Sequence, residues 1–93
     1  MKFDWDAEKN KANIRKHGID LSDAWQLFEH ELLVWHDDRY NYGEERYIGL
    51  GILNNMMVVF MAFVEKDTDT IRVISMRKAK KHEREKYQKA IKD

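Results

Sequence analysis

The chain has 93 residues, 43% of them hydrophobic and 12% aromatic, which suffices for one folded domain over residues 1–93 and excludes a disordered chain. It contains no cysteine, which excludes a disulfide framework and thiolate chemistry. Residues 20–69 hold eleven anions and three cations, whereas residues 70–93 hold nine cations and three anions. This segregation predicts two kinds of partner surface, unless the segments neutralise each other in the fold.

The chain offers no sign of export or membrane insertion. Its longest apolar run, residues 56–64, has the length of a strand and is too short to span a bilayer as a helix. The N-terminal "MKFDWDAEKN" lacks the apolar core of a signal peptide. We therefore expect a soluble, cytoplasmic protein without membrane contacts.

Two helices are predicted at the N-terminal end. Asp6 is a suitable N-cap for "AEKNKANIRKHG", which ends at Gly18, a typical left-handed C-cap. Asp20 is the N-cap of a second helix, whose apolar stripe at a spacing of 3.6 residues is Leu21, Ala24, Trp25 and Phe28. Trp25 is thus expected in the core, whereas Trp5 is either a hydrophobic staple before the first helix or a platform for stacking.

Four strands are predicted next, and their sequences are "LLVWH", "RYIGLGIL", "MMVVFMAFVE" and "TIRVISMR". The loop "DDRYNYGEE", a two-residue turn at Asn54–Asn55 and the turn "KDTD" separate them. Such short connections predict an antiparallel meander with the helices on one face. Gly49 and Gly51, on one face of the second strand, indicate the close approach of another element.

Strict alternation in the last strand sorts its side chains between two faces. One face would carry Ile71, Val73, Ser75 and Arg77. The other would carry Arg72, Ile74, Met76 and Lys78. The strand then continues without a turn signal into "AKKHEREKYQKAIK", which is predicted to be a basic C-terminal helix.

The polar residues are suited to cleavage of RNA, which needs a proton acceptor for the 2′-hydroxyl and cations for the developing phosphorane charge. The arginines and lysines of the chain meet the second need, and His17, Glu44, Glu45 or Glu83 the first. Trp5 and the tyrosines can stack on unpaired bases. The same residues have simpler interpretations, because His17 at a helix end favourably opposes the helix dipole. Arg84, beside two glutamates, can likewise form ordinary surface pairs. The histidines lack the spacing of metal ligands, so we expect no metal and no cofactor.

The segments "FDWDAEKNKANIRKHGIDLSDAWQLF", "GEERYIGLG" and "IRVISMRKAKKHEREKY" together resemble the BrnT family of toxins from type II toxin–antitoxin systems. The resemblance extends from Phe3 to Tyr87. It rests on matches in order, which include Trp5-Asp6, Lys16-His17-Gly18, Gly43-Glu44-Glu45-Arg46, Arg77-Lys78-Ala79 and Glu83-Arg84.

This resemblance implies an α+β, RelE-like fold with two N-terminal helices, a four-stranded antiparallel sheet and a C-terminal helix. It implies a metal-independent ribonuclease that inhibits translation and arrests growth. It also implies a BrnA-like antitoxin that neutralises the toxin, binds operator DNA on behalf of the complex and allows a higher-order toxin–antitoxin oligomer.

The resemblance further suggests a site where the last strand meets the basic helix. Arg77 and Arg46 would stabilise charge, and His17, Glu45 or Tyr87 would transfer protons. The remaining catalytic candidate is Arg84. The residues expected to bind RNA are Trp5, Lys9, Lys16, Arg72, Lys78 and Lys80.

Met76 departs from the family pattern, which usually has alanine at this position. In the strand interpretation above, Met76 lies opposite Ser75 and Arg77, on a face that either packs against a helix or lines the active site. Two other functions stay open: a module that binds RNA or an antitoxin without cleaving, and a structural partner whose exposed strand edge is completed by another chain.

Overall fold

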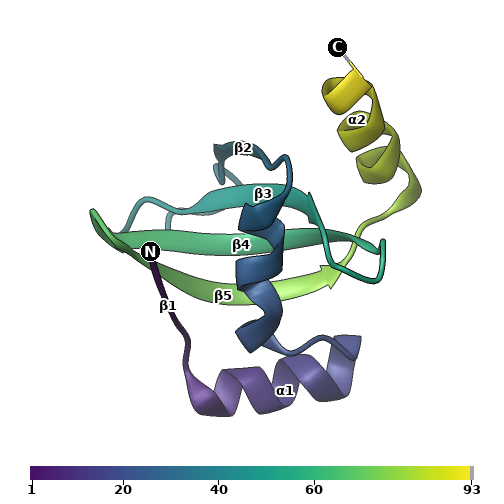
Figure 1. The fold of residues 1–93 in the computed structure, drawn as a ribbon. Helices are drawn as coiled ribbons and strands as arrows, with labels where there is room; N and C mark the ends of the chain where they lie inside the picture. Colours follow the sequence, from purple (N-terminus) through teal and green to yellow (C-terminus); the bar gives the residue numbers. More distant parts are fainter. Residues whose placement is uncertain (93) are drawn as a thin grey trace.

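The computed structural model describes residues 1–92, and Asp93 lies outside the described residues. Strand β1 (Lys2–Asp4) leads into helix α1 (Ala7–His17) and the 3₁₀-helix η1 (Leu21–Glu29). Four further strands follow, and helix α2 (Lys81–Lys92) ends the chain (Figure 1). These strands are β2 (Leu33–His36), β3 (Tyr47–Ile52), β4 (Val58–Asp67) and β5 (Thr70–Lys78).

The strands form one mixed sheet in the order β1-β5-β4-β3-β2. Strands β2 to β5 make the predicted antiparallel meander. The predicted count of four strands is wrong, because β1 pairs in parallel with β5, placing Phe3 opposite Ile71. Strand β1 has only three residues, and such a segment shows no alternation from which a strand can be predicted.

The predicted caps of the N-terminal helices are confirmed. The Asp6 carboxylate accepts a hydrogen bond from the backbone N–H of Lys9 at 2.9 Å. Gly18 has a φ of 70° and donates its N–H to the Ile14 carbonyl at 2.8 Å, which ends α1. Asp20 caps the next helix through the Ser22 amide.

The second helix has a tighter winding than its sequence predicts. As a 3₁₀-helix it repeats every three residues, so its buried side chains are Leu21, Ala24 and Leu27. Trp25, expected in the core, is instead 44% exposed. Gly49 and Gly51 lie beneath this helix and the segment after it, and a Cβ on Gly51 would approach Leu27 and Leu32 to 2.9 Å. The predicted close approach at the two glycines is thus confirmed.

A β-bulge in β5 overturns the predicted alternation of that strand. Ser75 pairs with Ala62, whereas the next pair is Val73 with Phe63, so Ile74 is an extra residue. Arg72, Ile74, Ser75 and Arg77 therefore share one face. Met76 lies on the other face and is fully buried among the helices, which settles the alternatives left open for its side chain.

The sheet has an apolar cluster on each face. On the helix face, Ile19 of the α1–η1 turn and the apolar residues of η1 pack over Val59, Met61, Phe63 and Val73. On the opposite face, which we call the arginine face, Ala79 and Tyr87 of the C-terminal segment pack near Leu50 and Phe60. The prediction that all helices lie on one face is therefore wrong, because α2 packs on the arginine face.

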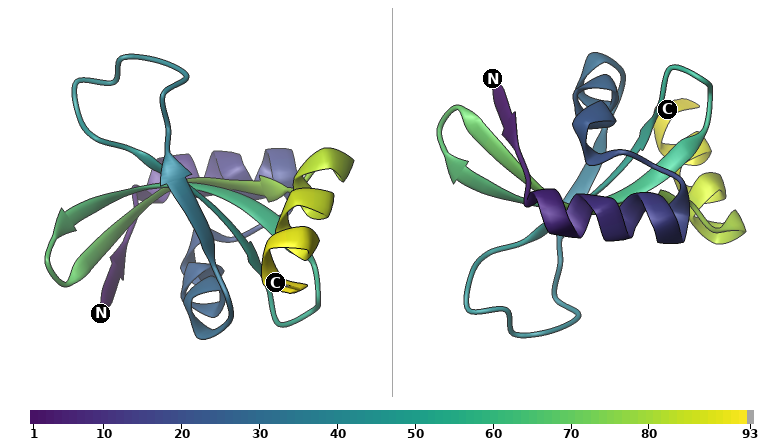
Figure 2. Two further views of the ribbon diagram at one scale, coloured as in Figure 1. Left: turned by 90° about the horizontal axis from the view of Figure 1, so that it is seen from above. Right: turned by 90° about the horizontal axis from the view of Figure 1, so that it is seen from below.

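The loop of residues 37–46 leaves the sheet on the side opposite η1 (Figure 2). At the other connection, Met56 rather than an asparagine has a positive φ, of 71°. The Met56 N–H bonds the Leu53 carbonyl at 2.8 Å, closing a three-residue loop instead of the predicted two-residue turn. None of the helices in residues 1–92 combines the length and the apolar character needed to cross a bilayer.

Candidate nucleic-acid interface

Side chains on the arginine face form three rows across the strands. The register joins one row as Leu33, Leu50, Phe60 and Arg77. It joins the next row as Trp35, Ile48, Ala62 and Ser75. The third row contains Asp37 and Arg46, which share a backbone hydrogen bond, together with the cross-strand pair Val64 and Arg72. The small side chains Ala62 and Ser75 thus stand between two rows that carry guanidinium groups.

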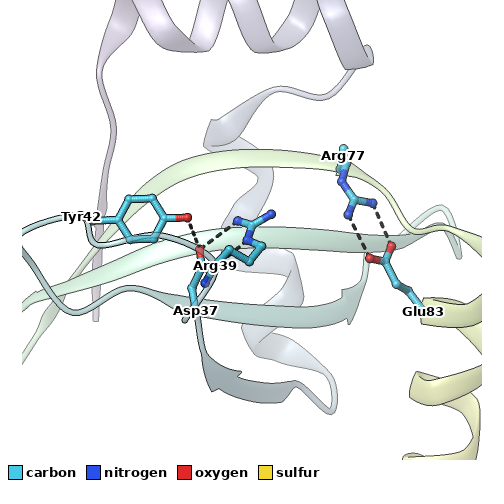
Figure 3. A network of polar contacts seen from close by, with 5 residues as sticks. All are labelled: Asp37, Arg39, Tyr42, Arg77 and Glu83. Atoms are coloured by element: carbon cyan, nitrogen blue, oxygen red, sulfur yellow. Dashed lines mark hydrogen bonds and ion pairs between the residues drawn. The ribbon is translucent and has the colours of Figure 1, made fainter.

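Arg77 is the most constrained of these cations. Its two terminal nitrogens donate to the Glu83 carboxylate at 2.8 and 2.9 Å, as Figure 3 shows. Its guanidinium carbon lies 3.9 Å from the centroid of the Phe60 ring. A bidentate pair and an aromatic surface together fix the guanidinium plane.

Glu83 also joins Arg77 to the start of α2. Its carboxylate accepts the backbone N–H of Lys80 at 2.7 Å, one half of a capping box. Burial alone would raise the pKa of Glu83, but the hydrogen bonds from Arg77 and Lys80 outweigh it and lower the pKa. Glu83 is therefore a carboxylate at neutral pH, and it anchors both Arg77 and the helix.

Arg46 and Arg72 meet at a pocket of about 180 Å³, which Lys9 and Ile74 also line. Arg46 is held by Glu44 at 3.0 Å and stacks on the Tyr42 ring at 4.0 Å. Arg72 pairs with Asp4 at 3.2 Å. The wall of the pocket thus carries three cations, Lys9, Arg46 and Arg72, beside the carboxylates of Asp6 and Glu44. A guanidinium group on this wall can contact phosphate oxygens.

A second pocket, of about 230 Å³, continues along α1. Lys9 and Ile74 line both pockets, and Lys16, His17 and Ser75 line only the second. His17 is partly buried, and this burial, with the nearby charges of Lys16 and Arg77, lowers the pKa of its imidazole. His17 is therefore neutral at pH 7 and can accept a proton.

Asn13 fixes α1 against the strand that carries Arg77. Its buried side chain accepts from the Met76 amide at 3.2 Å and donates to the Met76 carbonyl at 3.0 Å. The same amide group donates to the Ile19 carbonyl at 2.8 Å. These bonds hold the α1 side of the second pocket at a defined distance from β5.

The structure therefore gathers half of the predicted site residues around two joined pockets and the adjacent Phe60. They are Lys9, Lys16, His17, Arg46, Arg72 and Arg77.

Other predicted residues lie elsewhere. Glu45 lies beside Tyr47, whose pKa rises through burial and this neighbouring carboxylate, and Tyr47 packs on the helix face. Lys78 is paired with Val59, also on the helix face. Trp5 is partly buried against the helix-face core, away from the two pockets.

Three predicted residues belong to the C-terminal segment but not to the pockets. Tyr87 is buried and donates its hydroxyl to the Glu31 carbonyl at 2.7 Å. Arg84 donates to the Ala79 carbonyl at 2.9 Å. Lys80 contributes its backbone amide to Glu83, and its side chain is exposed. Lys80 and Arg84 thus have a structural part at the junction of β5 with α2, and Tyr87 joins α2 to the segment between η1 and β2.

Sequence reasoning missed Arg39 and Phe60. Arg39 lies above the Phe60 ring, at 5.4 Å from its centroid, and is bound to the buried Asp37 carboxylate. The Asp-x-Arg spacing at positions 37 and 39, directly after a strand, was the available signal, but the loop around it gave no reason to place it over the sheet. Among residues 1–92, no group of three or more His, Cys, Asp or Glu side chains is placed to hold a metal ion.

Fold and site define a small α+β protein whose arginine face is suited to a chain of phosphates. The model of the family described as "Ribonuclease toxin, BrnT, of type II toxin-antitoxin system" matches residues 5–83. The chain therefore belongs to the BrnT family of ribonuclease toxins.

Solved structures agree with this assignment. The crystal structure of the Brucella abortus ribonuclease toxin BrnT is similar at 26% identity and a TM-score of 0.65, covering 87% of this chain and 99% of that one. A comparison with curated proteins gave no match.

Proposed function

We propose that this chain is an endoribonuclease that binds RNA across the arginine face and cleaves it without a metal ion, which inhibits translation and arrests growth. The observation that carries the proposal is the gathering of Arg46, Arg72 and Arg77 around the small side chains of Ala62 and Ser75, next to a neutral imidazole. Guanidinium groups can stabilise a phosphorane, and an imidazole of lowered pKa can take a proton at pH 7.

The chemistry can be divided among these residues. The His17 imidazole accepts the proton of the 2′-hydroxyl as its oxygen attacks the adjacent phosphorus. The bond from phosphorus to the 5′-oxygen breaks, and this leaving oxygen takes a proton from water. Arg77 and Arg46 stabilise the charge on the phosphorane oxygens. Lys9, Lys16 and Arg72 bind the phosphates on either side and keep the chain in the two pockets.

Cleavage of RNA by the purified protein, in a buffer with a metal chelator, tests this function. We expect cleavage by the unchanged protein and a loss of roughly a hundredfold or more in Arg77→Ala, the size of effect seen when a charge-stabilising donor is removed. Arg15, exposed on α1 and outside both pockets, provides the matched control Arg15→Ala, which should cleave normally. Normal cleavage by a folded Arg77→Ala protein would contradict the assignment.

A module that binds without cleaving is the second candidate, and one observation favours it. Glu83 engages both terminal nitrogens of Arg77, the donors best placed to grip a phosphate. In that case charge alone would matter, and Arg77→Lys and Arg46→Lys would bind RNA normally. Stable binding without cleavage products, in an assay that detects cleavage by a control ribonuclease, would establish this alternative.

The family implies an antitoxin partner. We propose a BrnA-like antitoxin that neutralises the toxin in the cytoplasm, forms a higher-order complex with it and carries the complex to operator DNA. The described strands leave the outer edge of β2 unpaired in the sheet, which gives such a partner a strand to extend. Growth arrest on expression, relieved by the neighbouring gene of the operon, is the expected result, and arrest that this gene does not relieve would oppose it.

A further inference from the structure

Two arginines converge on one aromatic ring of the arginine face. The Arg77 guanidinium lies 3.9 Å from the Phe60 centroid, and the Arg39 guanidinium lies 5.4 Å from the same centroid. They come from β5 and from the 37–46 loop, far apart in the sequence. Figure 3 shows that each is joined to a carboxylate of its own, Arg77 to Glu83 and Arg39 to Asp37.

The Asp37 cluster holds Arg39 in one orientation. The Asp37 carboxylate is 1% exposed and accepts Arg39 Nε and Nη2, both at 2.8 Å, together with the Tyr42 hydroxyl at 3.0 Å. The hydrogen bond from the Arg39 side chain is the main cause that lowers the pKa of Asp37 to about 2. The carboxylate is thus fully ionised at neutral pH, and the long arginine side chain is ordered before any ligand arrives.

Arg39 nevertheless keeps donors for a ligand. Its bonds to Asp37 use the edge formed by Nε and Nη2, so the N–H groups of Nη1 are not used there. The side chain is 51% exposed, although its partner is buried. The exposed half of the side chain lies beside Phe60, above the candidate site.

We propose that Arg39 binds an RNA phosphate next to the one whose charge Arg77 stabilises, with the Phe60 ring, against which both guanidinium groups lie, setting the spacing between them. This inference rests on the proposed function. It extends the interface from the two pockets beside α1 to Phe60 and Arg39. The ligand class is a phosphodiester of single-stranded RNA. Asp37 is a positioning residue, because it acts through Arg39.

The salt dependence of binding tests the proposal without relying on cleavage. A short oligonucleotide methylated at every 2′-oxygen cannot be cleaved, and its affinity is measured by fluorescence anisotropy at several salt concentrations. For single strands each phosphate contact contributes about 0.7 to the slope of log K against log salt. We expect Arg39→Gln to weaken binding and lower the slope by about 0.7, whereas the matched Arg15→Gln leaves it unchanged.

A second variant separates the phosphate contact from loop fastening. Arg39→Lys keeps the charge but loses the fork toward Asp37, so we expect weaker binding with the slope retained. If Arg39→Gln does not fold, Arg39→Lys alone tests the inference. The inference would be overturned if folded Arg39→Gln kept both the affinity and the salt slope of the unchanged protein. It would also be overturned if Arg39→Lys bound the oligonucleotide with the affinity of the unchanged protein. Absence of binding by the unchanged protein would instead contradict the proposed function.

Discussion

The two faces of the sheet are stabilised in different ways. On the helix face, glycines, apolar side chains and one buried amide bring α1 and η1 into close contact with the strands. On the arginine face, the guanidinium groups of Arg39, Arg46 and Arg77 are each held by a carboxylate and an aromatic ring. The first face is built by excluding water and the second by ordering charge.

This difference separates residues that stabilise the fold from residues that act on a ligand. Changes on the helix face should reduce the free energy of unfolding and affect activity through folding or, at Asn13, through the position of α1 beside the second pocket. Changes on the arginine face should reduce binding or cleavage at a small cost in stability, because partly exposed ion pairs contribute little. Four substitutions test this separation of the two faces.

The largest loss of stability is expected for Asn13→Ala on the helix face. It leaves the buried N–H and carbonyl of Met76 and the carbonyl of Ile19 without their partner, which we expect to cost about 3 kcal/mol. Urea denaturation followed by circular dichroism measures this loss. Stability within about 0.5 kcal/mol of the unchanged protein would show that the amide does not hold α1 to β5.

Gly51→Ala tests the close packing on the same face. The new Cβ would lie 2.9 Å from both Leu27 and Leu32, so these side chains have to move, at a cost of about 1–3 kcal/mol. A lower thermal midpoint with normal RNA cleavage per folded molecule is expected. Loss of cleavage in the folded protein would contradict the separation of the two faces.

Met56→Gly should have a smaller effect of opposite sign. Met56 is 75% exposed and has a φ of 71°, a conformation that glycine adopts without a Cβ penalty. We expect a gain of about 0.5–1 kcal/mol in the free energy of unfolding, with cleavage unchanged. A loss of stability would mean that the side chain contributes more than its backbone strain costs.

His17→Gln should change stability least of the four substitutions, and its effect on the free energy of unfolding should depend on pH. Burial lowers its folded-state pKa below the ordinary 6.5, so between that lowered value and 6.5 the unfolded chain binds more protons. Stability should therefore rise with pH through this window and level off above it, and His17→Gln should remove this part of the rise. Thermal melting of both proteins from acid to neutral pH checks this, and parallel curves would contradict it.

Local signals made much of the fold predictable. Asp6 and Asp20 cap helices through their side chains, and Gly18 ends a helix because glycine readily adopts a positive φ. Gly51 indicates that another element packs closely, because a Cβ at this position would not fit. The antiparallel order of β2 to β5 also follows from short connections.

Features that depend on distant parts of the chain were not predictable in this way. The bulge at Ile74 reverses the faces of Ser75 and Met76 relative to simple alternation, and nothing local to β5 marks it. The winding of η1 depends on what packs beneath it, so the 3.6-residue stripe placed Trp25 wrongly. The same dependence limits prediction of the site. The sequence identifies the cations of α1 and β5 as site residues, but Arg39 reaches Phe60 only because its loop crosses the sheet.

The parallel pairing of β1 with β5 has a consequence for the timing of folding. Residues 2–4 are synthesised well before their partners, residues 70–72. Asn13 is likewise synthesised 63 positions before its partner Met76. At a synthesis rate of roughly 5–20 residues per second, that separation corresponds to about 3–13 s. The nascent chain therefore cannot close its sheet, or align α1 with Arg77, until β5 has been synthesised. The site of such a toxin stays unassembled until that strand has left the ribosome.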